Sequence, residues 1–207
     1  ALVQPAVEAV RKGIPVINID IQLDAQLLEQ AGGEVAFVGP DNFAAAYEVG
    51  KLLGKKLRNE DKVAIIEGLA AADNAQQRKR GFIKAIEEKG LRLVASEPAD
   101  WETEKAAEVF QAMWMRYPDL KAVYCSNDAM ALGVLQQMQE KKCYLPVVGF
   151  DNDAVMKEFL STGKLVATAD IFSSQMAVRG IEFALDVLEG RIENRGVHST
   201  AYEIIKQ

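Results

Sequence analysis

Short apolar runs followed by helical patterns recur along this chain, and this alternation limits its fold more than any other feature. The runs are rich in Val, Ile and Ala, and they are "KVAIIEG" (62–68), "LRLVASEP" (91–98), "KAVYCSND" (121–128), "YLPVVGFD" (144–151) and "KLVATAD" (164–170). Each but the last is followed at once by a helical pattern. Unbroken apolar strands that alternate with helices indicate a parallel sheet covered on both faces. The sequence therefore predicts an α/β fold with a doubly wound parallel sheet.

The helices between these runs have recognisable patterns and stop signals. In the segment that follows Asn42, apolar or small residues recur at i, i+3 and i+4 spacing, namely Phe43, Ala46, Tyr47, Gly50, Leu53 and Leu57. This rhythm predicts a helix with one apolar face. Gly90 and Gly163 follow two further patterns. We expect them to end their helices, because glycine adopts the left-handed conformation of a helix C-terminus without steric cost.

Composition limits the kinds of partner that fit. The 207 residues are 49% hydrophobic, so the chain can bury a core as one domain or as two small ones. Its net charge is −6 and its pI is near 5.0. A surface that follows nucleic acid is basic, so we expect no nucleic-acid partner, and the short basic run "QRKR" (77–80) fits a solvated helix face. No apolar run approaches the roughly 20 residues that span a bilayer.

Two cysteines and a single histidine, His198, supply little material for a disulfide framework or a metal site. Cys125 falls at the end of one predicted strand and Cys143 just before the next. In neighbouring parallel strands those positions lie at opposite edges of the sheet, much farther apart than the ~5.5 Å Cα separation of a disulfide. We therefore predict free, buried or half-buried thiols, no metal and no cofactor.

Polar residues stand where most of the predicted strands end, at Asp20, Glu67, Asn127 with Asp128, Asp151 and Asp170. In open parallel sheets, ligands bind in the crevice outside the carboxyl ends of the strands. Asn and Asp are also preferred N-caps of the helices that follow, and capping explains Asp41 and Asp128 as well as binding does. One cap does not explain a doublet, so we predict that Asp128 caps the helix and that Asn127 points into the crevice.

The chemistry at these strand ends fits binding better than catalysis. No glycine-rich phosphate loop follows a strand, and "EGLAAADN" (67–74) lacks the lysine and the glycine spacing of such a loop. There is no G-x-S-x-G motif, and the carboxylates are spread one per strand. Asp, Asn and Arg together match the vicinal hydroxyls of a polyol. Trp101, in "PADWETEK", adds an aromatic face for a sugar ring; a core tryptophan is the alternative, and the polar neighbours favour the first.

Eight segments of the chain, taken in order, resemble the sugar-binding proteins of bacterial ABC transporters of the ribose-binding type. They are "IPVINID", "GPDN", "VAIIEG", "RGFIKAI", "LVASEPADW", "AVYCSNDAMALGVL", "VVGFD" and "GKLVATA", and they cover essentially the whole chain. The D-allose-binding members are the most similar, because they share "AGG", "AIIEG" and the "PADW" run. The resemblance implies a periplasmic, non-enzymatic protein with two α/β lobes joined by a three-segment hinge. Such a protein captures one pentose or hexose between its lobes and delivers it to the membrane permease of an ABC transporter.

The same resemblance implies which residues hold the sugar. Carried onto the matching positions, the ligands are Asp20, Arg78, Trp101, Asn127 and Asp151, and Leu69 lines the pocket. Two positions depart from the family pattern. Ile21 stands where a polar or charged residue is usual, and Ile171 replaces a glutamine that usually binds sugar.

The resemblance also implies a division into lobes. The chain opens near the end of the first lobe, so residues 1–40 and 172–196 are expected to be a remnant of that lobe, and residues 41–171 and 197–207 the complete second lobe. The sequence has neither an initiator Met nor a signal peptide, which agrees with a processed or truncated product. An incomplete sheet exposes an open edge and apolar surface. We therefore expect self-association, or mobility, at residues 1–20 and 174–190.

The same fold forms the ligand-sensing effector domain of LacI-type transcriptional repressors, and this alternative function stays open. Such repressors usually have a proline-containing loop and an "LTT"-like run after the "VGFD" strand, whereas this chain has "STGKLVATADIF". No helix-turn-helix motif precedes that strand. These differences favour the transport protein. An enzyme is the least supported class, because no nucleophile–base pair is visible.

Overall fold

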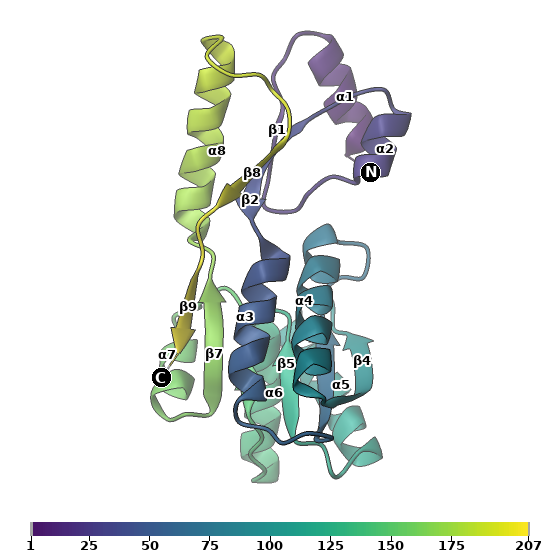
Figure 1. The fold of residues 1–207 in the computed structure, drawn as a ribbon, viewed down its shortest axis with the longest axis vertical. Coiled ribbons are helices and arrows are strands. Elements are labelled where there is room, and N and C mark those ends of the chain that lie inside the picture. The colour runs from purple at the N-terminus through teal and green to yellow at the C-terminus, as the bar shows by residue number, and fades with distance from the viewer. Residues whose placement is uncertain (1, 207) are drawn as a thin grey trace. The chain divides into compact units, whose positions relative to one another are not determined.

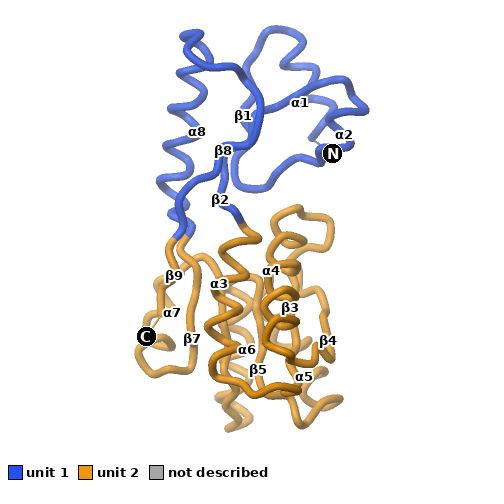
Figure 2. Tube along the Cα trace, viewed as in Figure 1, with its two compact units in different colours: residues 1–41, 171–202 blue, residues 42–170, 203–207 orange. Residues whose placement is uncertain are grey.

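A computed structural model describes residues 2–206 of the chain, which form two compact units (Figure 2). Unit 1 contains the described residues up to Asp41 together with Ile171–Tyr202. Unit 2 contains Asn42–Asp170 and the described residues from Glu203 onward. The chain therefore passes from one unit to the other three times. The order of the helices and strands can be followed in Figure 1.

Unit 1 is built on a small parallel sheet. Its strands are ordered β1 (Ile17–Ile19), β2 (Ala36–Pro40) and β8 (Val197–Thr200), and its helices are α1 (Val3–Arg11), α2 (Ala25–Gln30) and α8 (Ser173–Leu188). β2 lies between the other two strands and is buried throughout. Ala36 and Val38 of β2 pack against Phe183 of α8, which gives this unit a core of its own.

One side of α8 faces its own sheet, and the helix also carries apolar residues that face solvent. A side chain at Gly180 would collide with Ile19 of β1, so the helix and the sheet are in close contact there. The exposed large apolar residues of the helix are Val178, Ile181, Leu185 and Leu188. An exposed apolar stripe is a surface on which another segment or chain can pack. The self-association expected for this part of the chain stays a prediction.

Unit 2 has a six-stranded sheet with helices between its strands. The strand order is β4 (Arg92–Pro98), β3 (Lys62–Glu67), β5 (Ala122–Cys125), β6 (Val147–Val148), β7 (Leu165–Asp170) and β9 (Glu203–Lys206). Neighbouring strands are parallel, except that β7 and β9 are antiparallel. The helices are α3 (Asn42–Gly54), α4 (Asp73–Lys89), α5 (Thr103–Arg116), α6 (Asp128–Lys141) and α7 (Met156–Ser161). The predicted α/β fold with a mostly parallel sheet is confirmed.

Helices cover both faces of the unit 2 sheet, which explains its unbroken apolar strands. Along β5, Tyr124 points toward α4, where its ring centroid lies 5.2 Å from that of Phe82. Val123 and Cys125 belong to a core cluster that includes residues of α5 and α6. All four residues of β5 are buried. Successive side chains of a strand point to opposite faces of the sheet. When helices cover both faces, both sets of side chains are apolar, so the sequence does not alternate between polar and apolar residues.

Two groups of local predictions are confirmed. Gly90 ends α4 with a φ of 69°, and Gly163 follows α7 with a φ of 71°. Both lie in the left-handed region expected of a helix stop. Cys125 is buried, Cys143 is half-buried, and both thiols are free.

The two units divide the chain close to the expected lobe boundaries. Asp41 and Ile171 belong to unit 1 instead of the expected second lobe, and a longer segment near the end of the chain differs as well. Residues 197–202 belong to unit 1, whereas the sequence-based division placed residues 197–207 with the second lobe. The physical reason is strand pairing: β8 extends the unit 1 sheet, with Val197 opposite Phe37 of β2. Only β9 returns to the unit 2 sheet, beside β7. The assignment of the two units to lobes stays a prediction.

Candidate functional site

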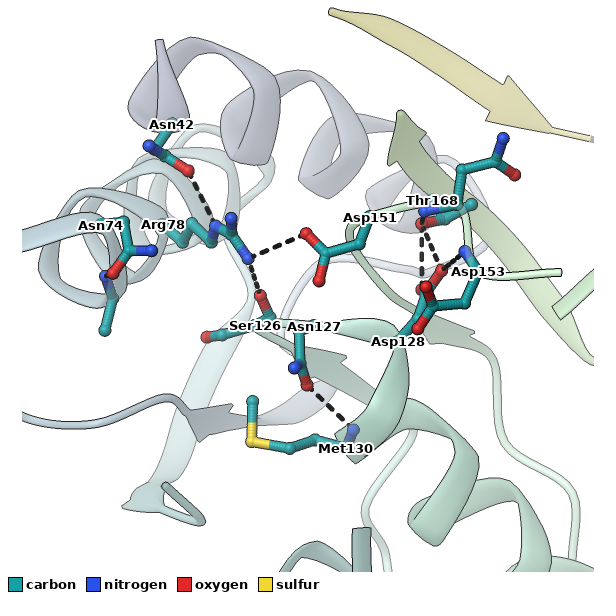
Figure 3. A network of polar contacts seen from close by, with 12 residues as sticks. Asn42, Asn74, Arg78, Ser126, Asn127, Asp128, Met130, Asp151, Asp153 and Thr168 are labelled. Atoms are coloured by element: carbon teal, nitrogen blue, oxygen red, sulfur yellow. Dashed lines mark hydrogen bonds and ion pairs between the residues drawn. The ribbon is translucent and has the colours of Figure 1, made fainter. Parts of the chain in front are cut away.

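Arg78 is the centre of a polar network at the carboxyl ends of β5 and β6 (Figure 3). The residue belongs to α4 and is only 3% exposed. Its Nε donates to Oδ1 of Asn42 at 2.8 Å, and its Nη1 donates to the carbonyl oxygen of Ser126 at 2.8 Å. A buried charge is costly unless it is hydrogen-bonded. These bonds give two of the guanidinium N–H groups a partner inside the unit and join α3, α4 and the end of β5.

Asp151 pairs with the same guanidinium. Its Oδ1 lies 3.4 Å from Nη1 of Arg78, and its side chain is 28% exposed, compared with 4% for the arginine. The arginine is therefore anchored inside the unit, and the carboxylate is the member of the pair that reaches solvent. Asp151 has a φ of 110°. A non-glycine residue keeps such a strained conformation only where the surrounding structure enforces it.

Two aromatic rings lie near the Arg78 guanidinium. Its Cζ is 3.7 Å from the ring centroid of Phe150 and 5.5 Å from that of Trp101. Both distances are within the ~6 Å range of cation–π contacts. These contacts add to the hydrogen bonds that fix the orientation of the side chain.

The Trp101 ring lies beside the end of β3. A Cβ atom at Gly68 would come within 2.1 Å of the ring, so only glycine fits there. Asp100 and Trp101 both have positive φ angles, 53° and 71°, which are uncommon for residues other than glycine. Trp101 is half-buried and packs against the core beneath α5 and α6. It therefore contributes to the core and still keeps part of its side chain exposed, as a stacking surface requires.

Asn127, and not Asp128 as predicted, caps α6 in the structure. Asn127 is the N-cap of α6, because its Oδ1 accepts a 2.9 Å hydrogen bond from the backbone N–H of Met130 (Figure 3). Asp128 is fully buried, and its carboxylate bonds to Thr168 and Asp153 instead. The prediction that Asp128 caps this helix was wrong. The Asn127 oxygen is used in the cap, and its amide nitrogen is the part of the side chain that can donate to a ligand.

The Asp128 carboxylate connects three segments beneath the site. Its Oδ1 accepts from Oγ1 of Thr168 at 2.9 Å, and its Oδ2 accepts from the backbone N–H of Asp153 at 2.8 Å. The pKa of Asp128 is raised to about 7. Burial is the main cause and the charges of Asp151 and Asp153 add to it, while the two hydrogen bonds act in the opposite direction. The start of α6 is thereby tied to β7 and to the loop that follows β6.

The loop after β6 is held in place by β7 on its other side. The backbone N–H of Asp151 donates to the carbonyl of Ala169 at 2.7 Å. The backbone N–H of Asn152 donates to Oγ1 of Thr168 at 3.2 Å, and its Nδ2 donates to Oδ2 of Asp170 at 2.9 Å. These bonds fix the position from which the Asp151 side chain reaches Arg78.

The other residues singled out in the sequence contribute in different ways. Leu69 is 47% exposed in unit 2, as an apolar lining residue would be. Asp20 belongs to unit 1, where it follows β1 with a φ of 72° and its N–H bonds to a carbonyl of β2 at 3.2 Å. Of the two departures from the family pattern, both in unit 1, Ile21 is 41% exposed and Ile171 is buried.

Sequence reasoning missed several residues that shape the site. The pattern after Asn42 predicts a helix and nothing more, whereas the Asn42 side chain accepts a hydrogen bond from Arg78. Phe150 belongs to an apolar run that predicts only a strand, and a backbone carbonyl such as that of Ser126 has no signature in the sequence. Glu67, expected at the strand edge, is buried and accepts from Lys79 and Ser96. Its role is to support the fold at the end of β3.

The arrangement is suited to hydrogen bonding with a polar ligand. It offers a carboxylate, a guanidinium, an amide and an aromatic ring within unit 2. Within residues 2–206, no group of three or more His, Cys, Asp or Glu side chains is placed to hold a metal ion. Across the same residues, no helix is both long enough and apolar enough to cross a membrane.

The chain is similar to known binding proteins in sequence and in fold. Residues 1–192 match a family described as periplasmic binding protein domain. The chain is 41% identical, over 99% of its length, to a D-ribose/D-allose-binding protein of Pseudomonas aeruginosa, and 36% identical, over 89%, to a D-allose-binding periplasmic protein of Escherichia coli. It spans only 66% and 61% of these two relatives. The whole chain also matches 74% of a solved ABC transporter solute binding protein from Burkholderia multivorans, with a TM-score of 0.95 and 38% identity.

Proposed function

The chain belongs to the periplasmic binding protein domain family, and from this premise we propose that it binds a monosaccharide of the ribose or allose type at the strand ends of unit 2. The similar proteins are named as binding proteins for D-ribose and D-allose, not as enzymes. The chain spans less than two thirds of those relatives, at 66% and 61%. Their sugar specificity is therefore carried to this chain as a proposal.

The observation that carries the proposal is the meeting of Arg78, Asp151 and Trp101. The Arg78 guanidinium is held by hydrogen bonds to Asn42 and to the Ser126 carbonyl. The Asp151 side chain is 28% exposed, and the centroid of the Trp101 ring lies 5.5 Å from Cζ of Arg78. Each sugar hydroxyl both donates and accepts hydrogen bonds, so adjacent hydroxyls fit an acceptor beside a planar donor. The C–H face of a sugar ring packs on an aromatic side chain.

Roles for the remaining proposed ligands follow from their chemistry. Asn127 would donate from its amide nitrogen, since its oxygen caps α6. Leu69, with 47% of its surface exposed, would add an apolar contact. Asp20, which belongs to unit 1, is included because of the family resemblance and its position directly after β1.

We further propose that the protein works in the periplasm and delivers its sugar to the membrane permease of an ABC transporter. The family is described as periplasmic, and the similar solved structure is an ABC transporter solute binding protein. Both properties belong to those proteins and support the same role for this one.

Titration calorimetry tests the sugar proposal, on the protein as its gene encodes it and on the 207-residue chain in parallel. The panel contains D-ribose, D-allose and other pentoses and hexoses. Asp151→Asn keeps the size of the side chain and removes the charge paired with Arg78. We expect at least a tenfold higher dissociation constant, because a hydrogen bond to a charged group contributes about 1.5–3 kcal/mol.

The matched control is Asp119→Asn. This carboxylate is 57% exposed, precedes β5 at its amino end and pairs with Lys62 at 2.7 Å. Its replacement should leave sugar affinity unchanged. If no sugar on the panel binds, or if Asp151→Asn binds as tightly as the wild type, the proposed site is wrong.

A further inference from the structure

Unit 2 has a second concave surface at the opposite end of its sheet, where the amino ends of β6 and β7 lie. Two hollows of about 450 and 320 Å³ share Lys56, Gly163 and Val166, so they adjoin one another. Their walls come from the end of α3, the segment before β6, the turn between α7 and β7, and the end of β9. We call this surface the lysine groove. It shares no residue with the proposed sugar site.

The floor of the lysine groove is apolar. It is lined by Leu52, Leu135, Met138, Leu145, Pro146 and Val166. Leu135 and Met138 are only 3% and 1% exposed, so they lie at its bottom. Tyr144 stands at the rim, 62% exposed, with Nζ of Lys164 5.7 Å from its ring centroid. An apolar side chain of a partner would lose water contact on this floor.

The rim of the groove is positively charged. Four lysines line it, Lys55, Lys56, Lys164 and Lys206, and its lining includes neither Asp nor Glu. Among the ion pairs of residues 2–206, none involves these four side chains. The chain as a whole has a net charge of −6. The groove is therefore a local concentration of positive charge on an acidic protein.

Some of these lysines also have local roles. Lys55 and Lys56 follow the C-terminus of α3, where positive charge is stabilising. Lys206 lies on the edge strand β9, where a lysine discourages pairing with another strand. Neither role requires that the lysines surround one apolar floor.

We propose that the lysine groove binds an acidic segment of a partner protein that carries an apolar anchor side chain. Carboxylates on that segment would pair with the lysine rim, and the anchor would enter the floor above Leu135 and Met138. The two adjoining hollows suit an extended peptide segment, which can place side chains in both. A flat lipid surface would meet the lysines and Tyr144 and would leave this floor uncovered. Because the sugar site lies at the other ends of the strands, both ligands can be bound at once.

Fluorescence anisotropy with a dye-labelled peptide, "EELEWEE", tests the proposal on the full 207-residue chain. We expect binding with a dissociation constant below about 1 mM, weakened when NaCl is raised from about 50 to about 300 mM because salt screens surface charges. The peptides "QQLQWQQ" and "EESESEE" remove the charge and the anchors in turn, and each should bind more weakly.

Charge reversal locates the binding. Lys56→Glu and Lys164→Glu should each raise the dissociation constant at least about threefold, in line with the energies of exposed ion pairs. The control Lys157→Glu changes an exposed lysine of α7 outside the groove and should have no effect. Circular dichroism verifies that each variant is folded.

Three results would overturn the proposal. The first is no binding of "EELEWEE" at about 1 mM peptide. The second is equal binding of either control peptide or equal effects of all three charge reversals. The third is co-sedimentation with phosphatidylglycerol vesicles that depends on Lys56 and Lys164 while the peptide does not bind, which would assign the lysines to a lipid surface.

Discussion

Replacement of Arg78 by leucine tests whether one buried side chain holds the strand ends of unit 2 together. The guanidinium makes 2.8 Å hydrogen bonds to the Asn42 side chain and the Ser126 carbonyl, pairs with Asp151, and lies 3.7 Å from the Phe150 ring centroid. Leucine fills part of the same space but makes none of the polar contacts. Both acceptors then lose the donor that Arg78 supplies inside the unit.

The structure sets the size of the effect. A hydrogen bond from a charged group contributes about 1.5–3 kcal/mol, so loss of the two 2.8 Å bonds costs about 3–6 kcal/mol. Burial of the leucine side chain offsets about 1–2 kcal/mol of this loss. The pair with Asp151 adds little, because it spans 3.4 Å and the carboxylate is partly solvated. We expect a net loss of about 1–5 kcal/mol in the free energy of unfolding, out of the 5–15 kcal/mol typical of a domain.

Urea unfolding followed by tryptophan fluorescence measures this loss. The chain has two tryptophans, Trp101 and Trp114, and both belong to unit 2, so the signal reports that unit. The control is Arg80→Leu, the same substitution two residues farther along α4 at an exposed position. It should change the free energy of unfolding by no more than about 0.5 kcal/mol. A loss below about 1 kcal/mol for Arg78→Leu would refute the reasoning.

Further expectations concern the ring of Trp101, the buried carboxylate and the thiols. Gly68→Ala would place a Cβ atom 2.1 Å from the Trp101 ring and displace it. We expect a shifted tryptophan fluorescence spectrum and about fivefold weaker sugar binding, which corresponds to the ~1 kcal/mol of an aromatic contact. An unchanged spectrum would contradict this packing. The pKa of Asp128 is raised from 3.8 to about 7 in the folded chain, so the folded state binds this proton more tightly than the unfolded state. Its contribution to the free energy of unfolding is complete below about pH 4 and is lost as the pH rises to about 7. Asp128→Asn should remove this decline of the free energy of unfolding with pH. If urea unfolding shows the same pH dependence in the variant and the wild type, Asp128 is not its cause. Thiol titration should count two cysteines in denaturant and one fast-reacting cysteine in the native chain. The reason is that Cys125 is buried and its pKa is raised, whereas Cys143 is half-buried. Two fast-reacting thiols in the native chain would show that Cys125 is accessible.

The fold of unit 2 could be predicted because its strands carry an unambiguous signal. β5 is buried on both faces, so its apolar residues are continuous, and the helices on either side have one-sided patterns. The end of the chain lacked such a signal. Whether residues 197–202 pair with β2 or follow β9 into the other sheet depends on partners more than 150 residues away in sequence, such as Phe37 opposite Val197.

The site was predictable in part. The position of Asp151 at a strand end and the polar neighbours of Trp101 predict two of its members, and the family resemblance adds Arg78; the three lie together in unit 2. The roles of Asn127 and Asp128 were not predictable, because both residue types favour the start of a helix. Which of them caps α6 is decided by distant partners. Thr168 and the Asp153 backbone hold Asp128, and only Asn127 is left with the extended backbone of a cap.

The loop after β6 shows why these networks matter for binding. Its three consecutive residues are each held by a different segment: Asp151 by Arg78 of α4, Asn152 by Asp170 of β7, and the Asp153 backbone by Asp128 of α6. Two of them, Asp151 and Asn152, have φ angles of 110° and 59°, a strain of about 1–3 kcal/mol each that persists only when neighbours enforce it. A carboxylate held in this way is already oriented before a ligand arrives. Binding then requires less ordering of the protein, so more of the interaction energy with sugar hydroxyls is retained as affinity.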